Sequence, residues 1–381
     1  MKVLPAIFIL CAILFSNCKK DNGNPGPQPG GDGSLNVYLA GNDQTGDGSV
    51  PCFWKNNTKT ILPNTNGGTA HSISVDGSNV YVAGRSWVDN AQTRFSPCYW
   101  LNGTRKDLPL MDVRGNGMAN SILAFNSTVY AAGTCSDSLE FFANSGWRNL
   151  PCYWKNGQLI KLELLNGFGN GSATSMTLVA APNRIITYIA GTSYAQSGFD
   201  EPCYWKIDPN VITTPGADID ATALGDKGYG GSALNASPGN ANQILNDPYI
   251  AGFVNNADDV NDPCYWHNGT RTDLSKINPN DHGAATAIDY AGNDVYVAGY
   301  TGNSVGTRVP CMWKNGTRTD LPLPAGANSG EATSIRIHGA DTYVGGTFGS
   351  SSGEFPCYWK NGKIVQYNSR GTASSIALSE K

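Results

Sequence analysis

Two of the nine tryptophans in this 381-residue chain are placed where they could bind a ligand. Trp87 and Trp147 stand outside the motif that holds the other seven, each in a long segment after a strand-like tyrosine motif. Flat aromatic faces beside guanidinium groups could stack a sugar ring and pair with an acidic group. The predicted ligand-binding residues are Arg85, Trp87, Arg94, Phe95, Phe141, Phe142, Trp147 and Arg148, with Arg114 nearby in sequence. The alternative is that these rings fill the interiors of two long loops.

Carboxylates in predicted loops allow a second chemistry, the cleavage of polysaccharides. Acid–base cleavage of a glycosidic bond needs two carboxyl groups aimed at one point. A hydrolase or lyase could use Asp89, Asp137, Asp200 and Glu201. Sequence spacing does not show whether these groups converge, so the enzyme stays an alternative and no residue is predicted to be catalytic.

Neither the histidines nor the acidic loops are spaced as a metal site. DQTGDG at 43–48 begins like a calcium loop, but Trp54 stands at the twelfth position, where a bidentate glutamate is required. NNADDVND at 255–262 is a second acidic loop, which we interpret as a solvated turn. The four histidines are scattered, at 71, 267, 282 and 338. We therefore predict no metal and no cofactor.

The charge balance excludes a nucleic-acid partner. The chain has 26 Lys and Arg against 30 Asp and Glu, a net charge of −4, and only 15% of its residues are charged. No basic field is therefore present to hold phosphates. The 46 glycines and 17 tyrosines are typical of short strands joined by tight turns.

These residues are carried by a sequence that repeats itself seven times. PCYWKNG at 151–157 has further copies that begin at 51, 97, 202, 263, 310 and 356. A tyrosine motif such as VYVAG at 80–84 precedes each copy, and a G-x-A-x-[SNA] motif such as that at 68–72 also occurs seven times. Residues 331–367 show the whole unit as EATSIRI, DTYVGGT, PCYWKNG and KIVQY, and we interpret each piece as one strand.

The repeat predicts an all-β fold, a seven-bladed β-propeller of four-stranded blades. A unit of about 46 to 61 residues without helical periodicity is what a propeller blade requires. Gly, Ala and Ser in the first strand suit the crowded axis, Cys and Trp alternate with Tyr in a third strand buried on both faces, and Asn-Gly favours a type I′ turn. The chain begins with a second strand and ends with a lone first strand at 371–379, so three N-terminal strands and the C-terminal innermost strand should close one blade.

Seven of the ten cysteines occupy one equivalent position in each repeat. Adjacent sheets pack about 10 Å apart, which exceeds the roughly 7 Å between Cα atoms that a disulfide spans. We therefore predict that these cysteines are small buried apolar residues without bridges. Cys135 stands outside the repeat and has no evident partner in the sequence.

The N-terminus carries a predicted export signal and membrane anchor. The apolar run at 3–15 is too short for a membrane-spanning helix but suits a secretory signal. The following SNCKKD resembles a bacterial lipoprotein signal, with Cys18 as the residue that is lipidated. We predict residues 1–18 as the signal, 19–34 as a Gly- and Pro-rich tether and 35–381 as the propeller. Ordinary signal-peptide cleavage nearby is the alternative.

The order of the strand motifs resembles that of kelch-repeat propellers, and W-x-N-G-x-x-x-D-L with A-x-S-I is similar to the HAF-repeat family of extracellular bacterial proteins. The resemblance covers residues 35–379. It implies a propeller and no single activity, because such families have unrelated functions. No catalytic residue is transferred, and the double glycine of kelch repeats is present in the second-strand motif only at Gly345-Gly346.

We predict a lipid-anchored binding module of the bacterial cell envelope, at the outer membrane, with the membrane as its partner through the anchor. The long connections after the second strands lie on one face, where a rigid ring allows binding sites to evolve. A glycan or a protein is the predicted ligand, bound over the units 67–112 and 113–165. The alternatives are a polysaccharide-degrading enzyme and a structural scaffold without a small-molecule site.

Overall fold

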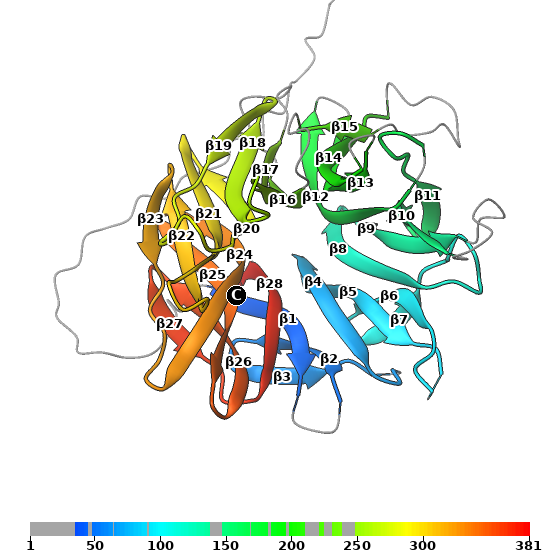
Figure 1. Ribbon diagram of the computed structural model, residues 1–381. Coiled ribbons are helices and arrows are strands. Elements are labelled where there is room, and N and C mark those ends of the chain that lie inside the picture. The colour runs from blue at the N-terminus through cyan, green and yellow to red at the C-terminus, as the bar shows by residue number, and fades with distance from the viewer. Residues whose placement is uncertain are drawn as a thin grey trace, which may run out of the picture.

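Seven four-stranded antiparallel sheets are arranged as blades around an axis (Figure 1). The computed structural model describes residues 35–44, 48–63, 65–89, 91–137, 147–167, 169–181, 184–195, 198–209, 221–224, 231–237 and 248–381. Within these ranges no helix is long and apolar enough to span a membrane. The predicted all-β, seven-bladed propeller is confirmed. The predicted signal, Cys18 and the tether lie outside the described residues.

Each blade runs from an innermost strand at the axis to a short strand at the rim. One blade joins both ends of the chain and consists of β28 (Gly371–Glu380), β1 (Leu35–Asp43), β2 (Val50–Lys55) and β3 (Thr58–Ile61). The other six, from the axis outward, are β4 (Gly68–Asp76), β5 (Asn79–Trp87), β6 (Phe95–Leu101) and β7 (Thr104–Asp107); β8 (Gly117–Phe125), β9 (Thr128–Asp137), β10 (Arg148–Lys155) and β11 (Gln158–Lys161); β12 (Gly171–Ala181), β13 (Arg184–Tyr194), β14 (Asp200–Ile207) and β15 (Ala221–Ala223); β16 (Gly231–Ser237), β17 (Tyr249–Asn255), β18 (Asn261–His267) and β19 (Thr270–Asp273); β20 (Gly283–Ala291), β21 (Asp294–Gly302), β22 (Arg308–Lys314) and β23 (Thr317–Asp320); and β24 (Ala327–His338), β25 (Asp341–Ser350), β26 (Gly353–Lys360) and β27 (Lys363–Gln366).

Asn-Gly pairs turn the third strand into the outermost strand. Asn102 and Gly103 have φ angles of 50° and 81°, the two positive values that a type I′ turn requires. The Asn102 side chain also accepts a hydrogen bond from the Val80 N–H at 2.9 Å, which fixes the turn to the second strand. The same contact recurs at Asn56, Asn156, Asn315 and Asn361. The predicted turn type is confirmed.

The strand that carries Cys and Trp is buried between neighbouring blades, as predicted. The buried indoles of Trp100 and Trp154 donate to the backbone oxygens of Pro63 and Pro109 at 3.1 and 2.9 Å. Both prolines lie in the crossovers that enter these blades from the preceding one. Each of these hydrogen bonds therefore links a blade to the crossover segment that enters it. The repeat cysteines are buried and form no disulfide within the described residues.

Each innermost strand contains a β-bulge at the same motif position, which was not predicted from the sequence, and β24 has a second register shift near its start, between Ala327 and Ser329. The pairing register shifts by one residue between the Ala and the following Ser-type position of every G-x-A-x-[SNA] motif. The Asn120 amide at one bulge donates to the backbone oxygen of Ala173 in the next blade at 2.8 Å, and Thr286 and Thr333 make equivalent bonds. The bulges therefore link successive blades around the axis. The bulged residues are His71, Asn120, Thr174, Leu234, Thr286, Thr333 and Ser374.

The two ends of the chain close the ring. β28 pairs antiparallel with β1 from Leu35 opposite Glu380 to Asp43 opposite Gly371. β28 also contacts β4 and β24 of the two adjacent blades. The predicted closure by three N-terminal strands and one C-terminal strand is confirmed, and it holds the connections between strands on a rigid frame.

Candidate functional site

The connections of the propeller emerge on two faces. The start of each innermost strand pairs with the end of its second strand, as Gly68 does with Ser86. The crossovers between blades and the joins from second to third strands therefore share one face, which we call the loop face. Short hairpins such as that between Asp76 and Asn79 lie on the opposite face.

Three of the predicted ligand-binding residues meet at the loop-face end of the β5–β6 hairpin. These residues, Arg85, Trp87 and Phe95, are called the aromatic cluster. Trp87 pairs with Phe95 across the strands, and their rings lie edge to face with 5.4 Å between centroids. The Arg85 guanidinium lies 4.3 Å from the centroid of Phe95, and its Nε donates to Thr69 Oγ1 at 3.2 Å. The cluster is thus packed upon itself, because Arg85 covers one face of Phe95.

Two other predicted residues contact the crossover between β7 and β8. Arg94 donates a hydrogen bond to the backbone oxygen of Val113. Trp147 lies over Gly115, its Cζ3 3.0 Å from where a Cβ would stand, and 48% of its surface is exposed. The crossover therefore has contacts with both predicted loops.

The remaining predicted residues have partners of their own or lie outside the described residues. Arg148 forms an ion pair with Asp137 at 3.6 Å, and Arg114 forms one with Asp112 at 2.8 Å. Phe141 and Phe142 lie outside the described residues. The predicted aromatic platform as a whole therefore stays a prediction.

The carboxylates considered for catalysis are distributed over three blades. Asp89 accepts hydrogen bonds from the hydroxyl and the N–H of Thr93 at 2.6 and 3.1 Å, and these bonds lower its pKa. Partial burial raises the pKa of Asp200, and its neighbour Glu201 is buried. Asp137 pairs with an arginine, as described above. None of the four lines the cavities described below.

The acidic loop at 255–262 is held together by its own side chains. Asp259 accepts a hydrogen bond from the Asn255 amide at 2.7 Å, and Asp262 forms an ion pair with Lys276 at 2.6 Å. Residues 45–47 of the other acidic loop lie outside the described residues. In the part of the chain that the structure describes, no three His, Cys, Asp or Glu side chains are gathered as a metal site.

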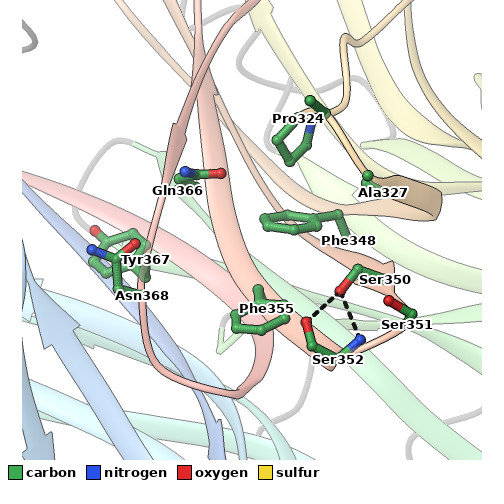
Figure 2. A pocket seen from close by; sticks show the side chains of 12 residues that line it. Pro324, Ala327, Phe348, Ser350, Ser351, Ser352, Phe355, Gln366, Tyr367 and Asn368 are labelled. Atoms are coloured by element: carbon green, nitrogen blue, oxygen red, sulfur yellow. Dashed lines mark hydrogen bonds between the residues drawn. The ribbon is translucent and has the colours of Figure 1, made fainter.

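A cavity of about 350 Å³ opens on the loop face of the blade β24–β27 (Figure 2). We call it the aromatic cavity. Phe348 of β25 and Phe355 of β26 are register partners, and their rings lie nearly parallel with centroids 5.5 Å apart. The lining also includes three serines at the β25–β26 turn, residues Pro324 to Ala327 where the crossover enters β24, and Gln366 to Asn368 at the end of β27. No charged side chain belongs to the lining.

A second cavity of about 300 Å³ lies on the other side of the same hairpin. We call it the charged cavity. Alternate residues of β25 divide between the two, with Thr347 and Gly349 in the charged cavity and Phe348 in the aromatic one. Arg308 Nη1 lies 2.6 Å from Glu331 Oε2 in its wall, and Glu354 also lines it. The end of the β25–β26 hairpin thus separates an uncharged site from a charged one.

The axis holds a third, polar cavity of about 120 Å³, lined by the innermost strands. His71 enters it and accepts a hydrogen bond from Thr69 at 2.6 Å, while its Nδ1 donates to the backbone oxygen of Ala119 at 3.2 Å. Burial, together with the positive charge of Arg85, lowers the pKa of His71 to about 4. The histidine is therefore neutral at neutral pH, and a continuous set of hydrogen bonds joins the aromatic cluster to the axis.

Comparison with known proteins supports the fold and gives no evidence about the activity. No protein-family model and no curated protein matches the sequence. A puromycin-hydrolyzing peptidase of Mycobacterium tuberculosis is similar in structure, with 11% identity, a TM-score of 0.53, and coverage of 86% of this chain and 53% of that chain. This chain therefore spans about half the length of that peptidase.

Two further solved structures are similar over most of their lengths. The β-propeller domain of the Trilobed protease from Pyrococcus furiosus has 10% identity and a TM-score of 0.46, with coverage of 88% of this chain and 95% of that chain. YjhT has 11% identity and a TM-score of 0.43, with coverage of 81% and 99%. At such low identity the likeness concerns the fold alone, and the resemblance to kelch and HAF repeats stays a prediction.

Proposed function

We propose that this protein is a lipid-anchored propeller of the bacterial cell envelope that binds a neutral glycan on its loop face. The aromatic cavity is the observation that supports this function most, because it combines two phenyl rings with hydroxyl and amide groups. The apolar face of a sugar ring can stack on phenyl rings, while its hydroxyls exchange hydrogen bonds with Ser, Asn and Gln side chains.

The uncharged lining of the aromatic cavity favours a neutral ligand. A carboxylate or an ammonium group placed there would lose water without gaining a partner of opposite charge. The volume of about 350 Å³ lies near the lower end of the range of about 300 to 1,000 Å³ for small-molecule sites. The cavity therefore suits a short stretch of a glycan. A protein ligand would need a much larger contact, about 800 Å² on each partner.

The charged cavity favours one alternative, the hydrolysis of polysaccharides. Glycoside hydrolysis uses one carboxyl group as an acid and a second as a nucleophile or base. Glu331 and Glu354 both line this cavity, and Glu331 forms an ion pair with Arg308. In this alternative Glu331 would be the nucleophile or base and Glu354 the acid. Release of reducing ends that disappears in Glu354→Gln would establish the hydrolase, and no release from a broad panel would remove it.

The anchor and the envelope location belong to the same proposal and are supported by the N-terminal sequence. Cys18 follows the apolar run, and the Gly- and Pro-rich segment after it would tether the ring at a distance. Cys18→Ala should abolish labelling by a fatty-acid analogue and move the protein to the soluble fraction. An acylated variant that remains in the membrane would contradict the anchor without affecting the ligand.

Binding of neutral and acidic glycans to the full chain in detergent tests the ligand class. Phe355→Ala removes one ring of the stacked pair and should weaken binding of neutral glycans roughly tenfold, equivalent to about 1.4 kcal/mol. Phe125→Ala is the matched control, since Phe125 is 40% exposed on the β8–β9 hairpin of the opposite face. A preference for acidic glycans, or equal binding by both variants, would overturn the proposed site.

A further inference from the structure

We propose that Cys135 and Cys152 form a disulfide when the chain folds in the presence of a disulfide-bearing oxidant. No partner for Cys135 was evident in the sequence, but the fold places its sulfur 3.3 Å from that of Cys152. Cys135 lies on β9 and Cys152 on the neighbouring strand β10. Both side chains have 0% exposure. The two thiols are therefore held in contact inside one blade, shielded from water.

The sevenfold repeat shows that this pair is specific to one blade. Each repeat cysteine is opposite the glycine of the tyrosine motif, as Cys152 is opposite Gly133, and faces the residue two positions after that glycine. The other six blades have no thiol at this second position. Their residues there are Asp43, Ser86, Ser193, Val254, Thr301 and Phe348. A bridge at Cys152 would contradict, for this one cysteine, the prediction that the repeat cysteines are without bridges. The argument against bridges between blades is unaffected, because this bridge lies within a blade.

The geometry permits the bond with a small adjustment. Formation of a disulfide needs a sulfur separation of about 2.05 Å, so the 3.3 Å between the two sulfurs must shorten by about 1.3 Å. The two residues are diagonal neighbours, because Cys135 is opposite Leu150 and Cys152 is opposite Gly133. Diagonal positions place Cα atoms about 7 to 8 Å apart in a regular sheet, at or just beyond the roughly 7 Å that a disulfide spans, so the backbone of the two strands must also move slightly. The bridge should therefore be reduced more readily than an unstrained one.

Oxidation must take place before the blade closes. Burial and the neighbouring thiol raise the pKa of Cys152, so the thiolate that attacks disulfides is scarce in the folded protein. While the blade is open, one thiolate attacks the oxidant, a protein or small-molecule disulfide, and forms a mixed disulfide. The second thiolate then displaces the oxidant's thiol, so that two thiols lose two electrons and two protons and the oxidant becomes two thiols. The new bond joins β9 to β10 at the base of the connection that contains Trp147.

Refolding of the full chain in mixtures of reduced and oxidised glutathione tests the proposal. The products are unfolded in acid, alkylated and mapped by mass spectrometry. We expect one linked peptide pair, containing Cys135 and Cys152, while the other six repeat cysteines are alkylated. Cys135→Ser should lose this linkage and leave Cys152 alkylated. Ser86→Cys creates the same arrangement against Cys98 and should add a second linkage.

The outcomes distinguish two thiols that only touch each other from two sulfurs joined by a disulfide bond. A chain that refolds with native melting behaviour and is alkylated at both Cys135 and Cys152 under every oxidising mixture overturns the proposal. A linkage between repeat cysteines of different blades also overturns it. Should refolding fail, the same mapping is applied to the full chain recovered from an oxidising periplasm and from a reducing cytosol. Linkage only in the periplasmic sample supports the proposal, and free thiols in both samples refute it.

Discussion

Two hairpins at equivalent places in the ring, β5–β6 and β25–β26, end on the loop face in opposite ways. In the first, Trp87 is paired with Phe95, whereas the equivalent pair in the second is Gly349 and Glu354. One position earlier along β5 the pair is Ser86 with Ser96. The equivalent pair in the second hairpin is Phe348 with Phe355. The aromatic residues have therefore exchanged faces of the sheet.

This exchange decides which side of a blade is open. Successive residues of a strand point to opposite faces, so moving the aromatic pair by one position moves it to the other side of the blade. In blade β4–β7 the rings lie on the face of Arg85, which covers Phe95. In blade β24–β27 the same face holds Thr347 and Gly349 and leaves the charged cavity, while the phenyl rings line the aromatic cavity. Substitutions at these positions test the difference between the two blades.

Phe348→Ala should have the largest effect on stability. Phe348 is only 7% exposed and belongs to a core cluster with Cys357 and Trp359. Loss of a buried phenyl ring should lower the free energy of unfolding by about 3 to 5 kcal/mol, measured by denaturant titration. The equivalent change Ser86→Ala should cost about 1 to 2 kcal/mol, because it removes the hydrogen bond that Ser86 accepts from Arg105 and the one that it donates to the Trp87 backbone oxygen. Similar costs at both positions would contradict the exchange of faces.

The bulge residue of the innermost strand is His71 in blade β4–β7 and Thr333 in blade β24–β27. His71 should make the stability of the protein depend on pH. The pKa of His71 is about 4 in the folded protein, against an ordinary value of about 6.5. Between about pH 6.5 and pH 4 the unfolded chain therefore binds a proton at His71 that the folded chain does not bind. The free energy of unfolding should fall as the pH is lowered from about 6.5 to about 4, by up to about 3 kcal/mol.

His71→Asn is the matched variant for this test. Asn120 occupies the equivalent bulge of the next blade and donates to a backbone oxygen in the way His71 does. The variant should keep the bond and lose this part of the pH dependence. Denaturant titrations of both proteins at several pH values between 4 and 7 give the difference, in which the other titrating groups cancel. Parallel curves would show that His71 is not the source.

Arg85→Ala should have a smaller effect, on stability and on His71 together. The variant loses the guanidinium over Phe95 and the hydrogen bond to Thr69, at a cost of about 1 to 2 kcal/mol. It should also raise the pKa of His71, because the charge of Arg85 is the second cause of its low value after burial. NMR titration of the histidine measures this shift. Arg94→Ala removes the same charge without this contact and should leave His71 unchanged.

The blades were predictable because their signals are local and repeated. Asn-Gly specifies its turn within two residues, and Cys and Trp at one parity specify a strand buried on both faces. The bulge at Asn120 was missed for a physical reason. An extra residue in the innermost strand changes its register with the second strand, and neither strand shows this in its own alternation.

The aromatic cavity was also missed, because an aromatic residue inside a strand is ordinarily a core residue. Its opening depends on what the crossover at 324–327, with its small residues, leaves uncovered, and this is a property of three separate segments. One signal was available. Alignment of the repeats places Phe348 and Phe355 where blade β4–β7 has serines, and the same alignment places Cys135 diagonal to a repeat cysteine on the neighbouring strand.

Trp147→Ala should have the smallest effect on stability and decides between the predicted aromatic platform and the aromatic cavity as the ligand site. Half of the Trp147 surface is exposed over Gly115, so the variant should change the free energy of unfolding by about 1 kcal/mol or less. If the aromatic cavity is the site, neutral glycans should bind this variant as they bind the unmodified chain and bind Phe355→Ala roughly tenfold more weakly. The predicted platform requires the reverse order. Calorimetric binding of one glycan to both variants, each with unchanged melting before comparison, therefore assigns the ligand to one blade or the other.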